Sequence, residues 1–241
     1  MKRIAALTGA LAMALWLGSC TDSPADLTLE LNGPDYSTLV NQPPVADPNG
    51  PYIADEGQRI QFDGHGSYDL DDDPLHFFWD FGDGRTFPEG PPDPRYSYGD
   101  NGEYSVSLTV EDGRGGTSGV STTTATIANV APNCGPITAY PLPINTEGPI
   151  RGDFMDPGWR DTHTYEWDWD YPHGDTETGE VTGSGRFKSV DGSHSYPTEG
   201  TYQIQLTVTD DDGATCATQS EVLVIAEKLQ KPSIEISDVT I

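Results

Sequence analysis

Residues 98–110 read YGDNGEYSVSLTV, and residues 196–208 read YPTEGTYQIQLTV. In both stretches a glycine precedes a tyrosine, after which apolar and polar side chains alternate. Alternation that leaves one face polar is typical of strands in antiparallel sheets packed face to face. The match holds at a constant offset of 98 residues (196 − 98), so the chain contains two copies of one unit.

A second match lies upstream, where FFWDF at 77–81 corresponds to YEWDW at 165–169, at an offset of 88. The two offsets differ by ten residues (98 − 88), which we place in the Gly/Thr-rich stretch 172–190 of the second copy. Alternate residues of the first match are expected to point inward: Leu75, Phe77, Trp79 and Phe81. The strand tryptophans Trp79, Trp167 and Trp169 are expected in the two cores.

A tryptophan strand opposed by a later strand that opens with a tyrosine after a glycine turn is the framework of an immunoglobulin-like sandwich. Tyr104 and Tyr202 stand where a tyrosine-corner hydroxyl bonds back to the chain. We therefore predict an all-β chain with tandem sandwiches over 43–130 and 131–228, followed by a tail at 229–241.

Composition agrees with many short strands joined by turns, since the 241 residues include 27 Gly and 20 Pro and only 34% are hydrophobic. Lys and Arg number 12 against 39 Asp and Glu, a formal charge of −27. This charge excludes nucleic acid as a partner, because phosphate binding needs a cationic face.

The N-terminus has the pattern of a secretory signal, with cationic Met1–Arg3 followed by an apolar run over 4–17. That run is too short for a helix that spans a bilayer. LGSC at 17–20 resembles the lipobox of bacterial lipoproteins, in which Cys20 carries the lipid. The alternative is an ordinary signal with an incidental cysteine. The resemblance implies a signal peptide at 1–19, a lipidated tether at 20–42, and export to the outer membrane or cell surface.

With Cys20 modified, Cys134 and Cys216 remain as an even pair in an oxidising compartment. They form either a disulfide or two buried free thiols. A short strand over the alternating Leu27, Leu29 and Leu31 of the tether is a further expectation.

The first repeat resembles the PKD (polycystic kidney disease) domain along its whole length. The resemblance rests on five motifs: GPY at 50–52, GSYDLD at 66–71, WDFGDG at 79–84, the Tyr98–Tyr104 turn and LTVED at 108–112. The second repeat resembles a variant of this family through DPGWRDTHTYEWDW at 156–169. It departs at Asp170-Tyr171, where the family shows Gly-Asp, which leaves the geometry of that turn open.

The resemblance implies that the first and last strands of each domain run side by side, which favours a Cys134–Cys216 bridge. It also implies a calcium site at the start of the first domain. The family's ligands fall here on Asn41, the carbonyl of Gln42, Asp69, Asp71 and Asp112. Crowded carboxylates repel, and a divalent cation relieves that repulsion; the alternative is a solvated acidic loop. In the second repeat Asn129 and Asp210 persist, but Trp159 stands opposite Asp71.

No enzymatic activity is expected. The five His form no His-Glu-x-x-His motif, and the chain has neither a Gly-x-Ser-x-Gly elbow nor a phosphate-binding loop. Asp80 and Asp168 are expected to be turn or surface residues. Phe78, Trp159 and Tyr171 are candidates for stacking on a sugar or peptide, with partial burial against loops or the neighbouring domain as the alternative.

The sequence therefore predicts a lipid-anchored, non-catalytic protein of the bacterial envelope, which acts as a spacer or as a protein or glycan interaction module. The alternative is a substrate-binding accessory protein of a secreted system that degrades polysaccharide or protein. The expected partners are the membrane, through the lipid on Cys20, and a protein or polysaccharide.

Overall fold

The computed structural model describes residues 40–172 and 174–226. Within these ranges all the helices and strands that could be assigned are β-strands, and no helix is present. The first domain contains β1 Tyr52–Asp55, β2 Ile60–Gln61, β3 His76–Asp80, β4 Thr86–Gly90, β5 Arg95–Tyr96, β6 Gly102–Glu111 and β7 Ser121–Ala128. The second contains β8 Asn133–Ala139, β9 Leu142–Pro143, β10 Gly148–Met155, β11 His163–Asp168, β12 Thr176–Val181, β13 Phe187–His194, β14 Gly200–Asp210 and β15 Thr215–Ile225. The predicted all-β class is confirmed.

In the first domain the larger sheet has the order β1-β7-β6-β3-β4, and β2 pairs with β5 in a separate ribbon. β1 runs parallel to β7, whereas the other pairs are antiparallel. Trp79 on β3 pairs with Leu108 on β6, so the two predicted rows face the same core. Trp79 is 1% exposed and Phe81 is fully buried, which confirms the inward row.

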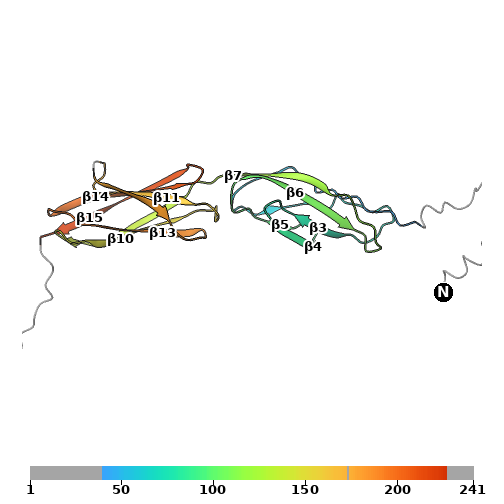
Figure 1. Cartoon of the computed structure of the whole chain (residues 1–241), viewed down its shortest axis with the longest axis horizontal. Coiled ribbons are helices and arrows are strands. Elements are labelled where there is room, and N and C mark those ends of the chain that lie inside the picture. Colours follow the sequence, from blue (N-terminus) through green and yellow to red (C-terminus); the bar gives the residue numbers. More distant parts are fainter. Residues whose placement is uncertain (1–39, 173, 227–241) are drawn as a thin grey trace, which may run out of the picture. The chain divides into compact units, whose positions relative to one another are not determined.

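In the second domain the five-stranded sheet β12-β11-β14-β15-β9 packs against the three-stranded sheet β13-β10-β8. Figure 1 shows β10 and β13 as a layer below β11, β14 and β15. Trp167 and Trp169 stack with ring centroids 5.0 Å apart in the core, as predicted. Cys134 on β8 and Cys216 on β15 form a disulfide, which covalently joins the two sheets.

The tyrosine corners are present in both domains. The Tyr104 hydroxyl donates to the carbonyl of Asp100 at 2.9 Å, and the Tyr202 hydroxyl donates to the carbonyl of Thr198 at 3.0 Å. Each bond ties the start of a core strand to the turn before it, which fixes where that turn lies.

Seven of the ten extra residues of the second copy lengthen two strands that follow one another along the chain. β4 and β5 of the first domain have five and two residues, whereas β12 and β13 of the second have six and eight. The signal peptide, Cys20, residues 21–39 of the tether with its expected strand, and the whole tail at 229–241 lie outside the described residues. Within the ranges that the structure describes, no helix is long and apolar enough to cross a membrane.

Candidate functional site

One end of the first domain gathers the residues predicted to hold calcium. The Asn41 side-chain amide donates to Asp112 Oδ2 at 2.6 Å, and the backbone N–H of Gln42 donates to Asp71 Oδ2 at 2.6 Å. Asp69 Oδ1 accepts from the backbone N–H of Asp71 at 2.8 Å. The start of the domain, the 69–73 loop and the turn after β6 therefore meet, as the resemblance implied.

The electrostatics at Asp112 favour the charged form of its carboxylate. Burial opposes the charged form of Asp112, but hydrogen bonds from Asn41 and from the backbone N–H groups of Arg114 and Gly116 outweigh it. The pKa of Asp112 is therefore lowered.

Asp73 is a member of this cluster that the sequence interpretation missed. One carboxylate oxygen each of Asp69, Asp71 and Asp73 lies within 4.8 Å of the others. Asp69 Oδ2 and Asp73 Oδ2 are buried and accept no hydrogen bond from the residues that the structure describes, while Asp73 Oδ1 is paired with Arg114 at 2.8 Å. Buried carboxylate oxygens without donors fit a hard cation with oxygen ligands such as Ca²⁺.

The second domain repeats this arrangement with a different acid. Asn129 donates to Asp210 at 3.2 Å, as Asn41 does to Asp112. Carboxylate oxygens of Asp156, Asp161 and Asp210 lie within 4.8 Å of one another, and all three residues are buried. Counting back along the sequence from Trp167 puts Trp159 at the position that Asp71 holds in the first domain. In the structure the carboxylate that joins Asp156 and Asp210 is instead that of Asp161.

A buried polar chain stands behind this acidic cluster. Lys188 Nζ donates to His163 Nδ1 at 2.9 Å and to the backbone carbonyl of Asp161 at 2.8 Å. His163 therefore carries its proton on Nε2 and donates to Asp156 Oδ2 at 2.8 Å. Because the side chains of His163 and Asp156 are both fully buried, this pair is structural and does not reach a substrate.

The three aromatic candidates do not form one platform. Trp159 packs against Gly99, where an added Cβ would lie 2.3 Å from the indole, and the Arg186 guanidinium covers its ring at 4.9 Å. Trp159 precedes β11, whereas Tyr171 follows the other end of that strand. Phe78 is a half-buried residue of β3 in the first domain and lines a shallow depression with Phe87 and Pro88.

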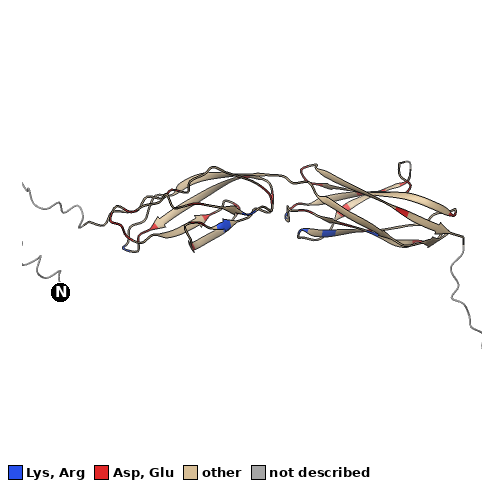
Figure 2. Cartoon of the chain, turned by 180° about the vertical axis from the view of Figure 1, so that it is seen from behind, with Lys and Arg blue, Asp and Glu red and all other residues tan. Residues whose placement is uncertain are grey.

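The described residues show no arrangement typical of a catalytic centre. Asp80 accepts from the backbone N–H of Gly82 at 2.9 Å, and Asp168 accepts from that of Asp170 at 3.2 Å, so both close turns as predicted. The depressions described on both domains are open and lie on strand faces. Basic residues are sparse, and Figure 2 shows that Lys and Arg occupy only a few short stretches of the described chain.

Residues 41–127 and 129–225 each match the family described as PKD domain. The chain belongs to the PKD domain family. A PKD domain is a non-catalytic module, and here two of them follow one another directly. The first match begins at Asn41, the residue that bonds to Asp112.

Curated relatives of these PKD domains include bacterial enzymes. The chain is 34% identical to Collagenase ColQ1 of Bacillus cereus (strain Q1) over 129 residues, which cover 52% of this chain and 13% of the collagenase. It is 31% identical to the pre-pro-metalloprotease PrtV of Vibrio cholerae serotype O1 (strain M66-2) over 149 residues, 61% of this chain and 14% of that protein. The chain therefore matches only a small part of each enzyme.

Among solved structures, a PKD domain of an M14-like peptidase from Thermoplasmatales archaeon SCGC AB-540-F20 is 24% identical, with a TM-score of 0.30. That match covers 40% of this chain and 98% of the other. The PKD1 domain of Vibrio anguillarum Epp is 25% identical, with a TM-score of 0.29, over 42% of this chain and all of that domain.

Proposed function

We propose that this protein is exported, anchored by a lipid on Cys20, and serves as a non-catalytic spacer or interaction module of a bacterial envelope. The observation that carries this proposal is the packed contact between two sandwiches whose interiors are filled by side chains. A sandwich whose interior is filled by side chains has no interior cleft for an active site. Two such domains in firm contact can instead act as a rigid spacer, which holds whatever is attached at one end at a fixed distance from the other end.

Several bonds support a firm contact. The backbone N–H of Arg160 donates to the carbonyl of Gly99 at 2.9 Å, and the Arg186 guanidinium donates to the carbonyl of Gly57 at 3.1 Å. At Gly57, an added Cβ would lie 2.7 Å from the backbone oxygen of Pro157, so the two domains touch here without room for a side chain. A flexible linker would not need such complementary surfaces.

The anchor is tested by growing cells that express the chain with a radioactive fatty acid. We expect the wild-type protein to be labelled and to sediment with membranes. The variant Cys20→Ala has no thiol for acylation, so it should lose all label and leave the membrane fraction. Equal labelling of the two proteins, or none of either, would contradict the anchor.

We also propose that Ca²⁺ binds at the start of the first domain, held by oxygen donors of six residues. These are Asn41, Asp69, Asp71, Asp73 and Asp112, with the carbonyl of Gln42 from the family pattern. The ion would offset the repulsion of buried carboxylates, and it would stiffen the segment through which the tether enters the domain.

The alternative function is capture of an insoluble substrate for a degradative system. The relatives named collagenases favour it, and collagen is therefore the first substrate to test. Phe78 is the aromatic candidate for contact because it lines an open depression beside Phe87.

A pull-down on insoluble collagen, chitin and cellulose measures this binding. If the alternative holds, Phe78→Ser should lower the affinity for one of the three by about fivefold, since stacking of one aromatic is worth about 1 kcal/mol. The variant Phe187→Ser serves as the control, because Phe187 is 83% exposed on the second domain, away from this depression. A wild-type protein that stays in the supernatant with all three would remove the alternative.

A further inference from the structure

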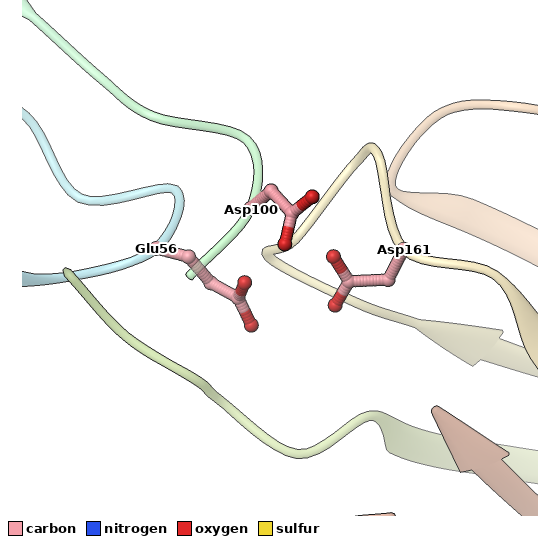
Figure 3. Close-up of side chains that lie close together, drawn as sticks. All are labelled: Glu56, Asp100 and Asp161. Atoms are coloured by element: carbon pink, nitrogen blue, oxygen red, sulfur yellow. The ribbon is translucent and has the colours of Figure 1, made fainter. Parts of the chain in front are cut away.

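Three carboxylates from three separate loops converge where the two domains meet. Glu56 follows β1, Asp100 precedes β6, and Asp161 lies between β10 and β11. One oxygen of each lies within 4.8 Å of the others. Figure 3 shows the three side chains pointing toward one another. Two of them belong to the first domain and one to the second, so this cluster is distinct from the acidic end that begins at Asn41.

The cluster contains buried oxygens without donors. Glu56 is 1% exposed and Asp161 is 4% exposed. Both oxygens of Asp161 and Oε2 of Glu56 accept no hydrogen bond from the described residues. A buried carboxylate without partners is costly, and removing it from water is offset only by a proton or by a cation. These oxygens therefore point to a ligand.

The basic side chains near the cluster are engaged elsewhere. Lys188 Nζ bonds to the backbone carbonyl of Asp161 and to a histidine ring rather than to a carboxylate. Arg160 lies 3.7 Å from Asp83, and Arg186 donates to the carbonyl of Gly57. The three carboxylates thus face one another without a described salt-bridge partner.

The electrostatic cost of this arrangement is large. Burial, and then the charges of Asp156 and Asp100, raise the pKa of Glu56 to about 7 despite its bond from Val130. Burial, and then the charges of Glu56 and Asp156, raise the pKa of Asp161 to about 8. Like charges at this spacing disfavour the ionised forms, and a bound cation reverses that effect.

We propose that Glu56, Asp100 and Asp161 bind a divalent cation of the calcium type, which ties the two domains together. The donors are all carboxylate oxygens, which hard cations prefer, and an irregular set from three loops suits the variable coordination of Ca²⁺ better than the strict octahedron of Mg²⁺. This proposal rests on the proposed spacer function and deepens it, because a bound ion would make the contact between the two domains firm.

Asp161 also links this site to the acids of the second domain, because it shares a cluster with Asp156 and Asp210. An ion held by Asp161 therefore lies between carboxylates of both domains. Neutralising Asp161 should affect the contact more than neutralising Asp100, which is only partly buried.

The test is a calorimetric titration with CaCl₂ of the full chain carrying Cys20→Ser and Asp71→Asn, which removes the proposed lipid and impairs the first-domain site. In this background Glu56→Gln and Asp161→Asn should each lower calcium affinity by at least about tenfold, because ligand charge sets affinity at such sites. The matched control is Asp55→Asn, which removes the same charge from the exposed residue next to Glu56.

Thermal melts with a chelator show whether the variants fold. Without calcium, Glu56→Gln and Asp161→Asn should melt at or above the temperature of their parent, since each removes a repelling charge. With calcium, only the parent and Asp55→Asn should gain in melting temperature. No heat of calcium binding in the parent, or equal affinity in Asp161→Asn and Asp55→Asn, would overturn the site. Neither result bears on fatty-acid labelling, so the site and the anchored spacer can fail independently.

Discussion

Replacing Trp79 by alanine is expected to lower the free energy of unfolding of the first domain by about 3–5 kcal/mol. The indole is 1% exposed, and it packs on Phe62 and Phe81 with ring centroids 5.9 and 6.4 Å away. Its Nε1 donates to the carbonyl of Pro91 at 3.2 Å. Alanine leaves a cavity and an unpaired carbonyl, and the surrounding β3 and β6 backbones are fixed by sheet bonds, so the cavity cannot close.

Urea unfolding measured by circular dichroism checks this value, with the second domain as an internal reference. Phe78→Ala is the matched control, because Phe78 is the neighbouring residue on β3 and points to the opposite, half-buried face. We expect the control to cost less than half as much as Trp79→Ala. If both variants lost similar free energies of unfolding, the alternation along β3 would not separate a core-facing side from an outer side, contrary to the prediction.

The strands that sequence alone predicts are those whose burial alternates. β6 and β14 each present buried residues at every second position, from Val106 to Val110 and from Ile204 to Val208. The length of β12 and β13 was not predictable in this way. Five of the six residues of β12 are polar or glycine, and its pairing with β11 is fixed by backbone bonds that no side-chain pattern reports.

The residues of the acidic sites also divide into those that a sequence pattern predicts and those that it does not. The pairing of Asn41 with Asp112 followed from a family motif, whereas Asp73 was missed because the 69–73 loop curls back, so that the N–H of Asp73 lies 3.3 Å from Asp69 Oδ1. Asp161 was missed for a similar reason, since its N–H bonds to the carbonyl of Gly158 in a tight turn that alters the count. Spacing along a chain predicts partners only where the backbone between them is regular.

The junction cluster was beyond sequence reasoning altogether. Glu56, Asp100 and Asp161 are separated by 44 and 61 residues, and no motif of the sequence connects the three. Only the packing of one domain against the next brings them together. The same packing favours the alternative that the sequence left open for Trp159, partial burial against the neighbouring domain. An aromatic in a Pro-Gly turn is typical of an exposed binding loop, but here Gly99 packs against the indole.

Removal of the disulfide should destabilise the second domain alone. Cys134 and Cys216 are 82 residues apart, and closing a loop of this length reduces the entropy of the unfolded chain by an amount worth about 4 kcal/mol. The bond also holds β8 against β15 across the two sheets, at the edge of the core where the three-stranded sheet ends. We therefore expect Cys134→Ser/Cys216→Ser to lose about 4 kcal/mol, a large fraction of the roughly 5–15 kcal/mol by which a folded protein is stable.

Urea unfolding with and without a reducing agent measures this loss. In the wild-type protein the reducing agent should shift only the transition of the second domain, because the other cysteine of the chain is Cys20 and the first domain contains none. The double serine variant should unfold at the same urea concentration with and without the reducing agent. Trp79→Ala should shift the transition of the first domain, and the cysteine variant should shift that of the second. If the two cores are independent, a protein that carries all three substitutions should show the sum of the two losses in stability. A first-domain transition that moves on reduction would instead reveal that the domains unfold together through the contact of Gly57 with Pro157 and Arg186.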